Sequence, residues 1–241
     1  GRLRALEGVR EIAMTTNGVL VAGAIDALVG GGLDRINVSI DSLDPQRFAA
    51  ITRRDDLARV LEGLAACERH PSLRPIKVNA VSQRGINDHA ALSLVEHFRG
   101  TGVIVRFIEY MDVGSTNGWK MDEVLPSADV VRRIDAELPL VRVDANYAGE
   151  TAERWRYRDG GGEIGVIASV TQAFCRDCTR ARLSTDGKIY TCLFAGEGHD
   201  LKALLRGGAD DAALERAVAA VWGARVDRYS ELRTAATAAR P

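Results

Sequence analysis

The first half of the chain repeats one unit, in which a short β-rich run is followed by a turn and an amphipathic helical stretch. Repetition of this unit is typical of α/β folds that surround a parallel sheet with helices. Asp44 followed by Pro45 marks one helix start, because a capping side chain precedes a ring whose φ suits the first turn. We expect strands at 11–15, 35–41, 76–81 and 103–111, and helices at 25–30, 45–69 and 89–98.

The expected strands alternate polar and apolar residues, whereas strands that are buried on both faces are normally apolar throughout. Asn37, Ser39 and Asp41 share one face of their strand, and Lys77 and Asn79 share one face of the next. A buried lysine is tolerated only where it meets an anion or water. The pattern therefore predicts a partial, incomplete βα barrel of the TIM type that holds a polar ligand near the carboxyl ends of its strands.

The βα rhythm stops after about Gly114, which predicts a partial barrel over 1–114 and a C-terminal α+β subdomain of hairpins and helices over 115–241. One hairpin is expected from strands at 154–158 and 163–170, and another from strands at 181–184 and 188–193. A closing helix is expected to pack in the core through apolar residues at helical spacing, namely Leu214, Val218, Val221 and Trp222.

Composition restricts the class of protein. The 241 residues are 46% hydrophobic and 27% charged, and no window holds the ~18 consecutive apolar residues that a membrane span needs. A net charge of -1 predicts no binding to nucleic acid or to an anionic membrane surface. We expect a cytoplasmic globular protein. Because the sequence begins at Gly1 rather than Met and stops at Pro241 after an alanine-rich run, we also expect a chain trimmed at both ends.

Three of the four cysteines lie close together in the sequence, which is unlike a disulfide framework and typical of a metal site. Cys175 and Cys178 share one tight turn, and Cys192 follows on the next hairpin. A three-residue loop with a left-handed Gly187 would place Cys192 opposite Arg180, whereas a two-residue turn would pair it with Ala181.

Two metal centres fit these cysteines. Three thiolates can hold a cubane iron-sulfur cluster that leaves one iron open to a small-molecule ligand. The alternative is zinc bound by the three cysteines and His199. We favour the iron-sulfur cluster, because open coordination among cations suits a reactive site.

Basic side chains surround the cysteines. Arg180 and Arg182 alternate on an expected strand, so both guanidinium groups project from one face, and Lys77 adds a charge from the barrel. This arrangement predicts an anionic ligand such as a phosphate, or a ligand with a guanine edge. The alternative is that the arginines only neutralise an anionic cluster or form surface ion pairs.

Five segments, in order and at matching spacing, closely resemble the GTP 3',8-cyclase family, the radical S-adenosylmethionine enzymes that open molybdenum cofactor biosynthesis. The segments are Thr15 to Gly18, Asn37 to Asp44, Lys77 to Asn79, Arg106 to Met111 and Phe174 to Leu183. The resemblance runs from the first strand to the last cysteine. Its motifs are weak singly and specific together.

The resemblance implies a partial radical S-adenosylmethionine barrel with two 4Fe-4S clusters. Ser39 and Met111 would contact S-adenosylmethionine, and the second cluster would be held by Cys175, Cys178 and Cys192. The expected GTP contacts are Thr15, Lys77, Arg180, Ala181 and Arg182.

In the family a deoxyadenosyl radical takes hydrogen from ribose carbon 3', and the sugar radical attacks carbon 8 of guanine. The product is (8S)-3',8-cyclo-7,8-dihydroguanosine 5'-triphosphate. The resemblance names no catalytic side chain here. It implies an electron donor, cyclic pyranopterin monophosphate synthase as the next pathway enzyme, and allows a homodimer.

The sequence also departs from the family. The C-x-x-x-C-x-x-C motif that holds the first cluster is absent from the 241 residues, as are the glycine-rich acidic strip and the paired glycines at the carboxyl end. We therefore expect a fragment that does not cleave S-adenosylmethionine by itself. Two alternatives are a non-catalytic, metal-stabilised scaffold that binds a nucleotide, and a different radical enzyme whose auxiliary cluster matures a peptide. Lys77 with Arg180 and Arg182 favours a triphosphate over a peptide.

Overall fold

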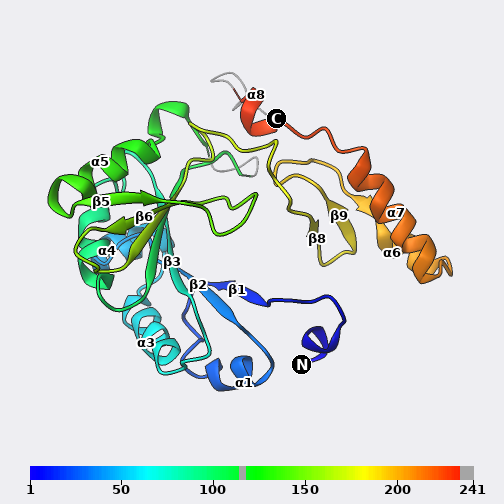
Figure 1. The fold of residues 1–241 in the computed structure, drawn as a ribbon, viewed down its shortest axis with the longest axis horizontal. Helices are drawn as coiled ribbons and strands as arrows, with labels where there is room; N and C mark the ends of the chain where they lie inside the picture. Colours follow the sequence, from blue (N-terminus) through cyan, green and yellow to red (C-terminus); the bar gives the residue numbers. More distant parts are fainter. Residues whose placement is uncertain (114–117, 234–241) are drawn as a thin grey trace.

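The computed structural model describes residues 1–113 and 118–233. It contains one seven-stranded sheet, and Figure 1 labels strands β1, β2, β3, β5 and β6 of it. The strand order is β1-β2-β3-β4-β7-β6-β5. Strands β1 to β4 and β7 pair in parallel, while β6 and β5 extend the sheet in antiparallel fashion. The strand bounds are β1 Ala13–Thr16, β2 Arg35–Ser39, β3 Ile76–Ser82, β4 Ile104–Glu109, β5 Leu140–Val143, β6 Glu153–Tyr157 and β7 Glu163–Ile167.

Helices cover one face of this sheet, with α3, α4 and α5 on the side away from the C-terminal segment (Figure 1). The buried face alternates with a polar face, as expected: Ile36, Val38, Val78 and Phe107 are buried, whereas Asn37 is only half-buried. The bounds are η1 Arg2–Ala5, α1 Ile25–Gly30, α2 Pro45–Thr52, α3 Leu57–Glu68, α4 Ala90–Phe98, η2 Met121–Glu123 and α5 Ser127–Glu137.

The single helix expected at 45–69 is wrong, because α2 and α3 are separate helices. The predicted start is confirmed, since the carboxylate of Asp44 accepts a hydrogen bond of 2.8 Å from the backbone N of Arg47, and Pro45 is the first helical residue. Arg53 then adopts a left-handed conformation with φ of 58°, which ends α2. The chain restarts as α3 after Asp56.

The mixed α/β class with a mainly parallel sheet is confirmed. The division into domains over 1–114 and 115–241 stays a prediction. The sheet itself does not end at residue 114, because later strands join it. The hairpin formed by β6 and β7 returns to the scaffold, where β7 pairs in parallel with β4. The sheet is therefore built from both sides of residue 114.

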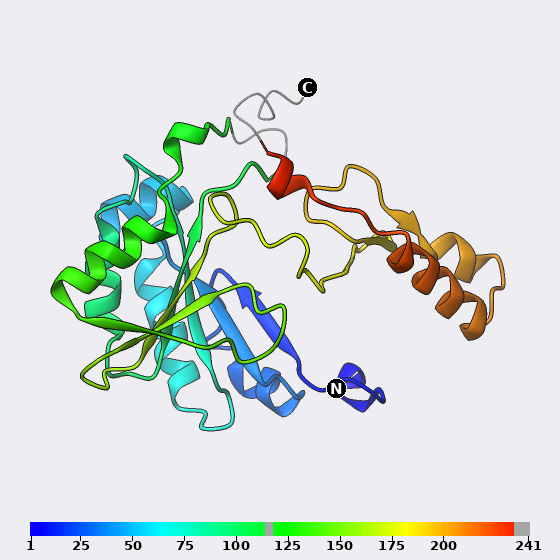
Figure 2. The same ribbon diagram turned by 45° about the horizontal axis from the view of Figure 1, so that its top comes forward.

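A C-terminal arm stands apart from the sheet (Figure 2). It contains β8 Arg182–Leu183, β9 Lys188–Tyr190, β10 His199–Asp200, α6 Leu201–Arg206 and α7 Asp211–Gly223, and the chain then returns to α8 Tyr229–Leu232. No residue of α7 is buried, so the expectation that this helix packs in the core is wrong. Its apolar residues lie on the arm rather than over the sheet, and Trp222 is 38% exposed.

The register of the arm hairpin confirms the three-residue loop. Arg182 pairs with Tyr190 and Leu183 with Ile189, which leaves residues 185–187 as the loop. Gly187 has φ of 84°, the left-handed conformation that this loop requires. Among the described residues, no helix combines the length and hydrophobicity needed to cross a membrane.

Candidate functional site

A cavity of about 160 Å³ lies where the arm meets the ends of β4 and β7. All three clustered cysteines line it, together with both predicted arginines and Met111. The lining residues are Ile108, Met111, Ile167, Ser169, Phe174, Cys175, Cys178, Arg180, Arg182, Cys192, Leu193, Phe194, Arg225, Asp227 and Ser230. The cysteines are free thiols. The structure therefore brings six of the predicted site residues to one cavity.

The turn that carries Cys175 and Cys178 is held by its backbone and by Arg225. The backbone N of Cys178 donates to the carbonyl oxygen of Cys175 at 3.3 Å. The guanidinium of Arg225 donates to the carbonyl oxygens of Cys178 at 2.6 Å and Cys175 at 3.4 Å, and it lies over the ring of Trp222. On the hairpin side, the backbone N of Phe194 contacts the sulfur of Cys192 at 3.4 Å. The thiols are thus placed by a tight turn and a neighbouring loop.

Cations change the chemistry of these groups. Burial alone would raise the pKa of Cys178, but hydrogen bonds from Arg180 and the charges of Arg180 and Arg225 bring that pKa below its usual value. The Nε of Arg180 lies 3.3 Å from the sulfur of Cys178. Burial and the charge of Arg180 lower the pKa of Arg182. The Cys178 position therefore favours a thiolate, the form that binds metals.

No three His, Cys, Asp or Glu side chains within 1–113 and 118–233 come close enough to hold a single metal ion. His199, the fourth ligand of the zinc alternative, lies on β10 opposite Ile189 and is not among the residues that line the cavity. The geometry gives the single-ion site no support.

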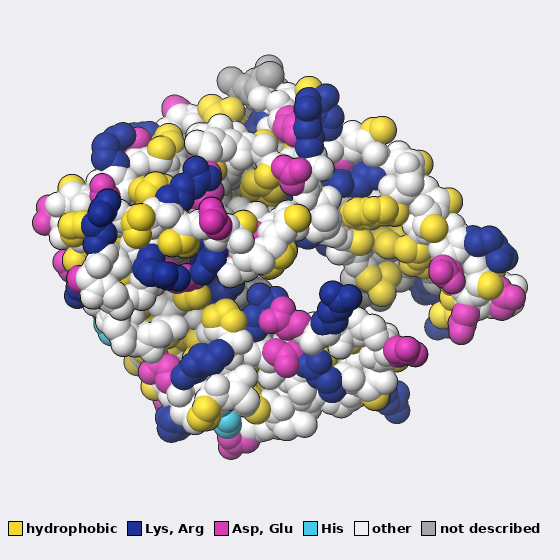
Figure 3. All heavy atoms as spheres, in the orientation of Figure 1, with side chains coloured by type: hydrophobic (Ala, Val, Ile, Leu, Met, Phe, Trp, Pro, Cys, Tyr) yellow, Lys and Arg dark blue, Asp and Glu magenta, His cyan; other side chains and the backbone are white. Residues whose placement is uncertain are grey.

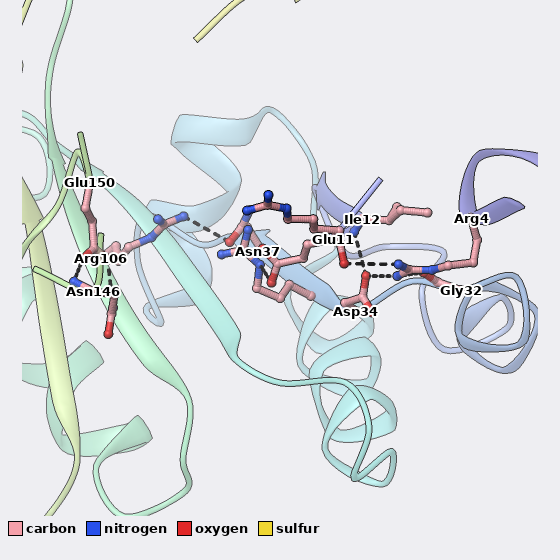
Figure 4. A network of polar contacts seen from close by, with 11 residues as sticks. Arg4, Glu11, Ile12, Gly32, Asp34, Asn37, Arg106, Asn146 and Glu150 are labelled. Carbon is pink, nitrogen blue, oxygen red and sulfur yellow. Dashed lines mark hydrogen bonds and ion pairs between the residues drawn. The ribbon is translucent and has the colours of Figure 1, made fainter. Parts of the chain in front are cut away.

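A second group of polar side chains lies on the open face of the sheet, where residues from β1 to β4 form a hydrogen-bonded row. Figure 4 shows the link between Arg106 and Asn37 in this row. The guanidinium of Arg106 donates to the side-chain oxygens of Asn37 and Asn79, each at 3.0 Å. Asn37 in turn donates to the hydroxyl of Thr15 at 3.0 Å. The row follows the strand register, in which Thr15 pairs with Asn37 and Asn79 pairs with Arg106.

Lys77 lies directly opposite Asn37 in the strand register, and the cations near it are Arg106 and Arg35. Burial, followed by the charges of Arg106 and Arg35, lowers the pKa of Lys77 to about 8. Burial also lowers the pKa of Arg106, and Arg35 adds to that effect. Cations that depress each other's pKa values are favourable places for an anion, because the anion relieves their mutual repulsion.

The loop between β5 and β6 lies near both the cysteine turn and the cations of the sheet face. Glu150 lies near enough to the cations to act on the pKa values of both Lys77 and Arg106. One residue earlier, Gly149 has φ of 83°, and a Cβ there would lie 2.8 Å from the carbonyl oxygen of Asp177 in the cysteine turn. Only glycine allows this approach. The loop thus touches the cysteine turn and faces the lysine.

The remaining predicted residues lie outside the cavity. Thr15 and Ser39 are exposed at the ends of β1 and β2, Lys77 lies on β3, and Ala181 is exposed before β8. A space-filling view shows an opening between the sheet and the arm, with hydrophobic side chains along the arm at its edge (Figure 3). The opening separates the sheet face from the far part of the arm.

Two cationic residues of the site carried no predicted role. Arg106 could have been found from the alternation that identified Asn37 and Asn79, because it occupies the matching position on β4. Arg225 gave no such signal, since it reaches the cysteine turn from 47 positions away in the sequence.

Two family models match the chain. The model described as the radical SAM superfamily matches residues 2–98, and the model described as Molybdenum Cofactor Synthesis C matches residues 103–231. The relative from Xanthomonas axonopodis pv. citri named GTP 3',8-cyclase is 51% identical over 233 residues, which cover 96% of this chain and 69% of the relative.

The chain belongs to the GTP 3',8-cyclase family.

A further GTP 3',8-cyclase, from Staphylococcus aureus, is 40% identical and covers 99% of this chain and 70% of its own length. The solved "Structure of TYW1 with a lysine-pyruvate adduct bound" matches 56% of this chain and 44% of its own chain, with a TM-score of 0.41 and 15% sequence identity. The GTP 3',8-cyclase matches confirm the recognition made from the sequence. They also confirm the enzyme class, radical SAM, and the pathway, molybdenum cofactor biosynthesis.

Proposed function

We propose that this chain forms the substrate-holding part of a cytoplasmic radical SAM GTP 3',8-cyclase. GTP binds between the cations of the sheet face and the arm, through Thr15, Lys77, Arg180, Ala181 and Arg182. S-adenosylmethionine lies against Ser39 and Met111. The single observation that carries the proposal is the cavity in which three free cysteines, two arginines and Met111 meet.

The cysteine set suits a 4Fe-4S cluster held by Cys175, Cys178 and Cys192. Three thiols line one cavity, the pKa of Cys178 is lowered, and no fourth cysteine lies among the lining residues. When bound, such a cluster supplies an iron with a position free for a small-molecule ligand. The guanidinium groups of Arg180 and Arg182 beside it hold an anion or the edge of a guanine, because their planar forks donate in pairs.

The polar face of the sheet would hold the phosphate end of GTP. The row of Arg106, Asn37 and Thr15 and the neighbouring Lys77 offer donors and positive charge on the same face. This fits a partial barrel that opens toward the arm, with the phosphates over the lysine and the base toward the cysteines. An electron donor and the next enzyme, cyclic pyranopterin monophosphate synthase, are the functional partners that this role requires. The proposal is compatible with a homodimer.

A non-catalytic nucleotide-binding scaffold is the second candidate. The observation that favours it is the row of donors and cations on the sheet face, which can hold a nucleotide without any radical chemistry. Both candidates bind GTP, and they differ in whether radical chemistry follows. The first cluster of the family is needed only for that chemistry.

The binding claim is tested on the chain after anaerobic reconstitution with iron and sulfide. We expect about four irons and four sulfides per chain and saturable GTP binding by calorimetry. A variant with Cys175, Cys178 and Cys192 changed to alanine should lose the iron and weaken GTP binding. Arg132→Gln, on the exposed surface of α5, is the matched control. Retention of full GTP affinity by the iron-free variant would contradict the link between cluster and substrate.

The catalytic claim requires the parts of the family that the match leaves uncovered. A chimaera that joins those parts of the Xanthomonas axonopodis relative to this chain should convert GTP to the cyclised nucleotide when both clusters are loaded. A fully loaded chimaera that binds GTP without forming this product would favour the scaffold.

A further inference from the structure

The end of β4 carries a buried carboxylate that holds the segment leading to the cysteine turn. Glu109 is 1% exposed. One of its oxygens accepts hydrogen bonds from the backbone N of Ser127 at 2.8 Å and the hydroxyl of Thr171 at 2.5 Å. The other accepts from the backbone N atoms of Val170 and Thr171, both at 2.8 Å. This fixes residues 170–171 to the strand end, four residues before Cys175.

A second buried acid stands three residues further along. The side chains of Asp112 and Arg233 are 7% and 1% exposed, and the Nη2 of Arg233 lies 2.7 Å from the Oδ1 of Asp112. The Nε of Arg233 donates to the same oxygen at 2.9 Å, and its Nη1 donates to the carbonyl oxygen of Ser169 at 3.1 Å. One guanidinium therefore joins the residue after Met111 to the segment that Glu109 also holds.

Aromatic rings complete the enclosure of this arginine. Arg233 lies 5.7, 5.0 and 5.4 Å from the ring centroids of Trp119, Phe194 and Tyr229. Phe194 stacks on Tyr229 at 4.4 Å, and the hydroxyl of Tyr229 donates to Asp112. The backbone N of Phe194 also donates to the sulfur of Cys192. Phe194 therefore links the ion pair of Asp112 and Arg233 to the hairpin cysteine.

The ion pair of Asp112 and Arg233 thus adjoins or contacts three segments that line the cavity, and we call these segments its three walls. Asp112 follows Met111 on the strand side, Ser169 precedes the cysteine turn, and Phe194 follows Cys192. A pair that only stabilised the fold would not need to bring these walls together. A buried ion pair is weak evidence for stability, because burying two charges offsets much of their attraction.

We propose that Asp112 and Arg233 are positioning residues, which set the place of the three cysteines relative to the strand end that carries Met111. This rests on the proposed function, because the positioned groups are those that hold the cluster and the two substrates. Neither residue is among those that line the cavity. Arg233 acts through Ser169 and Phe194, and Asp112 holds Arg233 and Tyr229.

The test compares Asp112→Asn and Arg233→Lys with Arg228→Gln in the reconstituted chain. Arg228 is the matched control, since it lies in the same terminal segment but its half-exposed side chain pairs with Glu231, and neither residue lines the cavity. Three quantities are measured: iron per chain, the dissociation constant of GTP, and hydrogen exchange of the amides of Val170, Thr171 and Phe194. Thermal unfolding records overall stability.

We expect both variants to keep their iron, to exchange the three amides faster, and to bind GTP about tenfold more weakly. Arg233→Lys keeps the charge and loses the planar fork, so its effect should survive even if Asp112→Asn folds poorly. A fall in thermal stability with unchanged GTP affinity and unchanged exchange at these amides would overturn the proposal. If the unaltered chain bound no GTP, the proposed function would fail, whereas the amide exchange would still decide whether the pair holds the three walls.

Discussion

Lys77 gives the sharpest prediction, because its charge should make GTP binding and folding stability respond to pH in opposite directions. Burial and the charges of Arg106 and Arg35 lower its pKa to about 8. Binding of a triphosphate needs the charged form. The folded chain alone is more stable when the half-buried Lys77 is neutral.

The magnitude for binding follows from the charged fraction of Lys77. With a pKa of about 8 the lysine is roughly three-quarters charged near pH 7.5 and about one-tenth charged near pH 9. GTP affinity should therefore fall by about eightfold over this interval, where the phosphates are already ionised because their last pKa is about 6.

The sign for stability is the reverse. The folded pKa lies below the ordinary value of 10.5, so between these values the folded chain binds fewer protons than the unfolded chain. The free energy of unfolding should therefore rise with pH from about 8 to about 10.5, and the full penalty applies below pH 8. Lys77→Met should remove this slope and raise stability at neutral pH by roughly 1 to 3 kcal/mol.

The assay is calorimetric GTP titration at several pH values, with urea unfolding of the ligand-free chain at each. Lys77→Arg is the control, because arginine stays charged throughout and any remaining pH effect belongs to the nucleotide. An equal loss of affinity in Lys77→Arg and the unaltered chain would refute the role of the lysine. So would urea stability that falls between pH 8 and pH 10.

Three further predictions concern the scaffold. Arg106→Met removes a charge that depresses the pKa of Lys77, so the pH midpoint of GTP binding should move upward; an unchanged midpoint would mean that the two cations do not interact. Gly149→Ala should lower urea stability by about 1 to 2 kcal/mol from its left-handed backbone, and by more because of the contact with Asp177. Gly160→Ala, also left-handed but with open space around it, should show only the backbone part, and equal losses would contradict the contact. Phe107→Ala, in the buried face, should cost about 3 to 5 kcal/mol in the same assay, and a loss below 1 kcal/mol would contradict its place in the core.

The sequence predicts the scaffold well where a local period decides the structure. The alternation at Ile36 and Val38 predicted the buried face of the sheet. For the hairpin the sequence left two registers open, and the pairing of Leu183 with Ile189 and the left-handed Gly187 decide for the three-residue loop. The 45–69 helix failed because the break depends on the backbone of Arg53, which the apolar spacing does not reveal. The α7 prediction failed because helical spacing cannot say whether an apolar stripe meets a core.

In the candidate site, too, the residues with a local sequence pattern were predicted and those from distant parts of the chain were not. Cys175, Cys178 and Cys192 were predicted from their spacing to hold a cluster, and the structure brings them to one cavity through the predicted turn and hairpin. Arg225 and Arg233 were missed because they reach the site from the far end of the chain. Arg233 contacts Asp112 across 121 positions, a separation that no local pattern records.

The most direct measurement is the electron paramagnetic resonance spectrum of the reduced, reconstituted chain during GTP titration. The account predicts that the cluster signal changes and that the change saturates at one GTP per cluster, because the proposed site puts the nucleotide base beside the three cysteines. A signal that stays the same at saturating GTP, while calorimetry shows GTP bound, would contradict the shared site.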